Sequence, residues 1–81
     1  MIDESQMRAA RSLLDWTQAD LAEKAGISAP TIKRMEKIGL GRSSMDNVQA
    51  VQRALEEAGV VFIPENGGGA GVRLAKPRGK E

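Results

Sequence analysis

A chain of 81 residues can hold one domain with a small core, and the absence of cysteine and histidine excludes disulfides and the common zinc sites as sources of stability. The formal net charge is only +1, and no apolar run approaches the roughly 20 residues that a membrane-spanning helix needs. The N-terminus is acidic before any apolar stretch, unlike a signal peptide. We therefore expect a soluble, cytoplasmic protein without membrane contact, and association is the remaining way to support so small a core.

The first two helices are predicted from their caps and apolar spacing. The first covers about residues 4–15, with Asp3 or Ser5 as its N-cap. The second begins at the N-cap Thr17 and ends at Gly26, because glycine readily adopts the left-handed conformation that stops a helix.

Two further helices follow, separated by the loop GLGRSS. Ser28 caps the third helix, and Pro30 lies in its first turn, where a missing N–H is tolerated. The apolar positions of the third helix are Ile32, Met35 and Ile38. Ser44 caps the fourth helix, which runs to about Ala58 and ends at Gly59.

The pattern changes after the fourth helix. The segment VVFI, residues 60–63, is β-branched and aromatic and predicts a strand, and residues 72–75 form a possible second strand beyond a glycine-rich turn. We predict a mainly α chain of four helices with a short C-terminal β-strand or hairpin. Residues 1–59 form the helical domain, residues 60–75 a β extension, and residues 76–81 a basic flexible tail.

The segment TQADLAEKAGIS, residues 17–28, opens a pair of short helices joined by a tight turn. Helices of only about eight to ten residues need tertiary packing, and the short connection makes them cross steeply in a helix-turn-helix arrangement. Basic residues gather in residues 33–42 and 73–80. Such clusters on a near-neutral chain indicate contact with nucleic acid, with a solvated surface of mixed charge as the alternative.

The stretch LLDWTQADLAEKAGISAPTIKRME resembles the DNA-binding unit of the xenobiotic-response-element-type regulators, the superfamily of phage repressors and Cro. The resemblance covers roughly residues 6–60, and it rests on TQADLAEKAGIS, on the spacing of Ile32 and Met35, and on Glu36. It implies a repressor-like helix-turn-helix domain in a small bacterial regulator of transcription that binds double-stranded DNA. We expect no cofactor and no metal.

The resemblance also implies that the third helix enters the major groove. The positions that it assigns to base readout are Ala29, Pro30, Thr31, Lys33 and Arg34. Ala29 and Pro30 can contact only a thymine methyl, whereas Arg34 suits a bidentate contact with guanine. The positions assigned to DNA phosphates are Thr17, Gln18, Ser28, Lys37, Arg42 and Ser43. Arg11 and Glu36 are expected to form a structural ion pair.

An enzyme is not expected, because the commonest general base and the strongest nucleophile are both missing. The favoured function is a sequence-specific DNA-binding regulator of transcription. One alternative is the antitoxin of a toxin–antitoxin pair, which would also bind DNA. Another is an adaptor with the same fold that binds protein instead, although the basic run at residues 33–42 argues against it.

A homodimer is predicted, because one recognition helix covers few base pairs and relatives bind two half-sites about one helical turn apart. The strand at residues 60–63 has apolar groups on both faces, and an open strand edge favours pairing with another chain. The residues predicted for dimerisation are Val60, Val61, Phe62, Ile63, Val72 and Leu74. Arg73, Lys76 and Arg78 would then lie near the DNA. The alternative is an intramolecular hairpin that covers the fourth helix.

Overall fold

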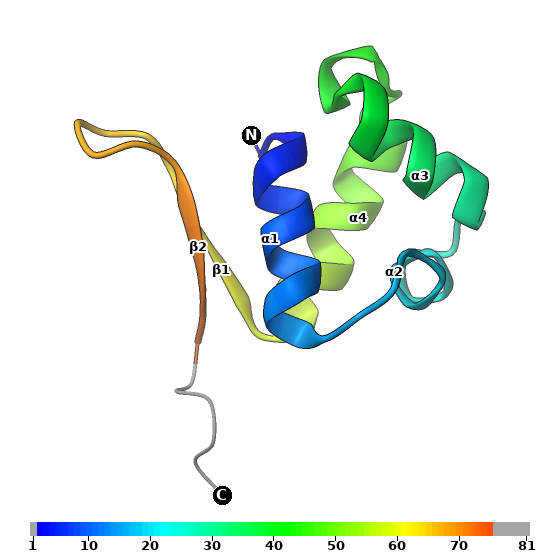
Figure 1. The fold of residues 1–81 in the computed structure, drawn as a ribbon, viewed down its shortest axis with the longest axis horizontal. Coiled ribbons are helices and arrows are strands. Elements are labelled where there is room, and N and C mark those ends of the chain that lie inside the picture. Colours follow the sequence, from blue (N-terminus) through cyan, green and yellow to red (C-terminus); the bar gives the residue numbers. More distant parts are fainter. Residues whose placement is uncertain (1, 76–81) are drawn as a thin grey trace, which may run out of the picture.

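The elements follow the predicted order in a computed structural model that describes residues 2–75 (Figure 1). They are the helices α1 (Glu4–Leu14), α2 (Gln18–Ala25), α3 (Ala29–Ile38) and α4 (Met45–Glu57), the short 3-10 turn η1 (Leu40–Arg42), and the strands β1 (Val60–Ile63) and β2 (Gly71–Leu74). The predicted mainly α fold with a C-terminal hairpin is confirmed. The predicted basic tail at residues 76–81 lies outside the described residues.

Side-chain caps fix where the helices begin. Asp3 caps α1 in a reciprocal pair with Gln6, and Thr17 caps α2 in the same way with Asp20. Each pair satisfies two backbone N–H groups that the helix itself leaves without acceptors. Gly26 ends α2 with φ of 74°, a conformation that suits glycine, and its N–H donates to the Ala22 carbonyl at 2.9 Å. The turn between α2 and α3 is therefore set by local sequence.

The core lies where the four helices meet. The largest side chains that are fully buried are Met7, Leu21, Ile32, Met35, Val51 and Leu55. Ile38 differs from its expected place, since it is 44% exposed at the last position of α3. Leu40, from the η1 turn that follows, is buried instead. The apolar side of α3 therefore ends at Met35.

The C-terminal strands form a hairpin within the chain. They pair antiparallel, with Val60 opposite Leu74 and Phe62 opposite Val72. Val60 belongs to the core that the helices build, and the other three residues of these pairs pack against that core. Because side chains alternate across a strand, Val61 and Ile63 face away from the helices, and both are only half-buried. The inner face of the hairpin is therefore already covered.

Gln6 fastens this hairpin to α1. The residue is only 7% exposed, and its side-chain Oε1 accepts the Asp3 N–H at 3.0 Å within the cap. Its Nε2 donates to the carbonyl oxygens of Gly71 at 3.0 Å and Ile63 at 3.4 Å. A two-stranded hairpin is marginal by itself in water, so this docking supports it.

The hairpin and the two-helix unit lie on opposite sides of the molecule. Figure 1 shows β1 and β2 on one side of α1, and α2 and α3 on the other side of the α1–α4 pair. The strand β2, which includes Arg73, therefore lies on the side of the molecule away from α3 within one copy of the chain. Among residues 2–75, no helix is long and apolar enough to cross a bilayer.

We predict that Gln6→Ala loosens the hairpin more than it disturbs the helices. It removes a buried donor from two strand carbonyls and should lower the free energy of unfolding by about 1–3 kcal/mol. Urea unfolding gives the size, and amide hydrogen exchange should show faster exchange in β1 and β2. The matched control is Ser12→Ala, at an exposed position of α1. Equal exchange in both variants would contradict the role given to Gln6.

Candidate nucleic-acid interface

The outward side of α3 is basic. Lys33, Arg34 and Lys37 are exposed, and Pro30 is exposed in the first turn. Between residues 33 and 42 the only acidic side chain is Glu36, which is buried. The charge that faces solvent along this helix is thus entirely positive, as contact with a polyanion requires.

The first turn of α3 carries less hydrogen-bonding capacity than the middle of the helix. Ala29 is half-buried, and Pro30 has no donor. The Ser28 and Thr31 hydroxyl oxygens lie 2.7 Å apart, and Ser28 Oγ also accepts the Thr31 N–H at 3.3 Å. Ser28 and Thr31 therefore serve the cap. Arg34, in the next turn, has its guanidinium donors available.

A cleft of about 160 Å³ continues this surface from α3 to the start of α4. Its lining includes Thr31, Arg34, Ile38, Arg42, Ser43 and Asn47. Ser44 caps α4, and its Oγ accepts the Asn47 N–H at 3.1 Å. The sequence predicts Ser44 as a cap, but its pattern does not place Ser44, Asn47 or Ile38 in the site. Only folding reveals that these residues adjoin Arg34 and Arg42.

Glu36 holds α1, α2 and α3 together beneath the basic surface. Its carboxylate accepts from Arg11 Nε at 2.7 Å and Arg11 Nη2 at 2.8 Å, a bidentate ion pair. Gln18 Nε2 donates to the same carboxylate at 2.9 Å. Arg8 Nη1 donates to the Glu36 backbone carbonyl at 2.8 Å. The structure thus brings the predicted pair together and adds two partners that the sequence did not indicate.

The charge of Glu36 is stabilised although its side chain is only 4% exposed. Burial raises the pKa of its carboxyl. Hydrogen bonds from Arg11 and Gln18 and the positive charges of Arg11 and Arg8 lower this pKa by more than burial raises it. The resulting pKa is below the ordinary value of 4.5. Glu36 is therefore ionised at neutral pH.

The start of α2 offers N–H groups to a phosphate. The Thr17 hydroxyl accepts the Asp20 N–H at 3.0 Å. The backbone N–H groups that have no acceptor within the helix are therefore those of the first two helical positions, Gln18 and Ala19. The Gln18 side chain is bound to Glu36. Its predicted phosphate contact therefore rests on the backbone N–H and the second amide hydrogen.

The residues predicted for dimerisation are not equally accessible. Val60 is 3% exposed and belongs to the core, and Phe62, Val72 and Leu74 pack against that core. Val61 and Ile63 remain on the outer face of the hairpin. Among residues 2–75, no three acidic side chains are grouped closely enough to hold a metal ion.

Comparison with known protein families agrees with this geometry. A helix-turn-helix family model matches residues 7–58, which is more than half of the chain. The chain therefore belongs to the helix-turn-helix family of Cro- and C1-type DNA-binding regulators, as the sequence resemblance implied. The match covers most of α1 and all of α2, α3 and α4, and it leaves the hairpin outside. No curated protein matches the chain.

The buried ion pair gives a prediction for stability. Arg11→Met or Glu36→Gln alone should cost about 3–5 kcal/mol, because each leaves the other member poorly compensated in the interior. The double variant should lose less than the two single losses together. Urea unfolding of all three variants measures this coupling. Small and additive losses would mean that the pair contributes little to the fold.

The lowered pKa of Glu36 gives a prediction for pH. Because this pKa is lower in the folded chain than in the unfolded chain, ionised Glu36 stabilises the fold above its ordinary pKa. That contribution falls as the pH drops through the folded-state pKa. The free energy of unfolding, measured by urea titration from neutral pH to about pH 3, should therefore fall more steeply for the wild type than for Glu36→Gln. Parallel curves would contradict this assignment.

Proposed function

We propose that the protein is a sequence-specific regulator of transcription that binds an operator as a homodimer, with α3 in the major groove. The observation that carries the proposal is the exposed basic side of α3, held in place by the Glu36 contacts to α1 and α2. Membership of a family of DNA-binding regulators supports it independently.

Base readout is assigned to the middle of α3. Arg34 is the principal reader, through a bidentate contact with guanine, and Lys33 and Thr31 assist it. Ala29 and Pro30 supply apolar surface for a thymine methyl. The support for this division is that Arg34 is exposed, whereas the Ser28 and Thr31 hydroxyls already contact each other.

Phosphate contacts are assigned to the two ends of the surface. Thr17, Gln18 and Ser28 lie where α2 and α3 begin, and Lys37, Arg42 and Ser43 lie where α3 ends and η1 follows. Ser44 and Asn47 join the second group, because they line the same cleft as Arg42. Such contacts fix the position of the protein on DNA without reading its sequence.

The homodimer is proposed because the DNA contact that one copy can make is small. One helix of ten residues reaches only a few base pairs, and two half-sites double the number of contacts. Two-fold symmetry is the commonest closed arrangement for two copies of one chain.

Selection of bound sequences from a random DNA library, followed by a panel of single base-pair changes, tests this function. Arg34→Ala should cost about 1–3 kcal/mol on the selected site and should remove the preference at one base pair. Lys37→Ala is the matched control on the same helix. It should weaken binding to every sequence alike. It should also make the plot of the logarithm of the DNA-binding constant against the logarithm of the salt concentration less steep, by about one unit of slope.

Two results would contradict the proposal. If wild-type selection recovers no common sequence, the protein does not read bases. If Arg34→Ala weakens every sequence equally, Arg34 belongs with the phosphate contacts and base readout must lie elsewhere on α3.

A further inference from the structure

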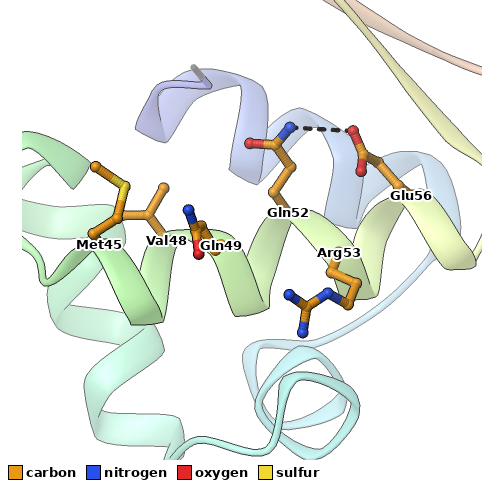
Figure 2. Close-up of a pocket in the computed structure, with 6 residues that line it drawn as sticks. All are labelled: Met45, Val48, Gln49, Gln52, Arg53 and Glu56. Atoms are coloured by element: carbon orange, nitrogen blue, oxygen red, sulfur yellow. Dashed lines mark hydrogen bonds between the residues drawn. The ribbon is translucent and has the colours of Figure 1, made fainter.

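The exposed side of α4 forms a shallow groove of about 550 Å³ (Figure 2). The residues that line it are Met45, Val48, Gln49, Gln52, Arg53 and Glu56. Met45 is 54% exposed, and among the described residues the other exposed large apolar side chain is Ile38, at 44%. Gln49 and Gln52 lie in the middle of this face, and Gln52 Nε2 donates to Glu56 Oε2 at 3.1 Å.

Two opposite charges border the middle of the face. Asp46 and Arg53 are both exposed and lie two helical turns apart on α4, so their side chains share one side of the helix. Among the residues that the structure describes, neither Asp46 nor Arg53 takes part in an ion pair.

We infer that this face of α4 binds a second copy of the chain, with the two α4 helices antiparallel. The inference rests on the homodimer proposed above and names its interface. A two-fold axis between Gln49 and Ala50 places Asp46 of each copy opposite Arg53 of the other. The face is therefore complementary to itself in charge, and the exposed Met45 gains apolar cover.

The direction in which this face of α4 points lets both copies of α3 in the dimer face one DNA duplex. Figure 2 looks onto α4 with α1 and the hairpin on one side and the α2–α3 unit on the other. Figure 1 looks down the shortest dimension and shows the hairpin and the α2–α3 unit at opposite sides. The exposed side of α4 thus faces along the shortest dimension. An axis that runs from the hairpin side to the α3 side leaves both copies of α3 on the same side of the dimer.

The thickness of the chain also suits the DNA repeat. Its shortest extent is 18 Å, and packed helices lie about 8–10 Å apart. Two copies stacked across this dimension span more than 36 Å, which leaves room for their α3 helices to lie one turn of B-DNA, about 34 Å, apart. Two adjacent half-sites on one face of the duplex are therefore within reach.

A dimer through the outer face of the hairpin does not leave both α3 helices on the same side. Val61 and Ile63 alternate with the strand residues that pack on the helical core, so they lie on the face of the hairpin turned away from the helices. Figure 1 shows α3 on the far side of those helices. A dimer formed face to face through Val61 and Ile63 would turn the two α3 helices in opposite directions. The sequence predicts a dimer interface at residues 60–75, and the experiments below distinguish that interface from the one on α4.

Single-cysteine cross-linking distinguishes the two surfaces, because the chain contains no cysteine. Gln49→Cys lies beside the proposed axis, and Ile63→Cys is the matched control on the hairpin. Mild oxidation at tens of micromolar should convert most of Gln49→Cys, but not Ile63→Cys, to a covalent dimer. A dimer through Ile63→Cys alone, or monomers from both variants, would overturn the inference.

A charge exchange tests the same contact without oxidation. Arg53→Glu should weaken self-association, measured by sedimentation, by about tenfold or more. Adding Asp46→Arg should restore it, because the exchanged charges again face each other across the axis. Thermal unfolding of each variant shows whether the monomer fold is intact. Failure of the double variant to recover, with that fold intact, would overturn the inference.

Binding to DNA with a single half-site keeps this inference separate from the proposed function. If Arg53→Glu lowers dimer formation but leaves single-half-site binding within about twofold, the α4 interface and the reading by α3 both stand. If the wild type dimerises through α4 yet binds no DNA, the proposed function fails and the interface stands. If the wild type binds DNA but Gln49→Cys does not cross-link, the interface fails and the function stands.

Discussion

The buried carboxylate of Glu36 is the interaction on which the arrangement of the helices depends. It lies on α3, and its partners Arg11 and Gln18 lie on α1 and α2, while Arg8 binds its backbone carbonyl. One ionised group thus sets the angle at which α3 stands on the other helices. A buried ion pair adds little net stability compared with apolar packing, so its value here is the fixed orientation of α3.

That orientation divides the molecule into surfaces with different properties. The side of α3 that faces solvent is positive, since Glu36 is turned inward while Lys33, Arg34 and Lys37 are exposed. The opposite side is closed by the hairpin, which Gln6 binds through two strand carbonyls. The free side of α4 lies between them and has charges of both signs. DNA contact and self-association can therefore use separate surfaces of one small domain.

Local chemistry explains why much of the fold was predictable from sequence. Thr17, Gly26 and Ser28 specify where α2 ends and α3 begins through bonds to near neighbours, and the pair Arg11–Glu36 follows from the family resemblance. Gln6 gave no such signal, because its strand partners lie 57 and 65 residues away and are backbone carbonyls that any residue carries. Likewise, the spacing of Ile38 continues the apolar stripe, and only the η1 turn shows that Leu40 is buried instead.

Amide resonances of the chain, mapped during titration with its selected operator, show directly which surface binds DNA. If α3 reads the bases, the large shifts fall at the start of α2, along α3 and around η1, while the outer face of the hairpin stays unchanged. Shifts centred on β1 and β2, with α3 unaffected, would contradict the proposal that this protein reads DNA through α3.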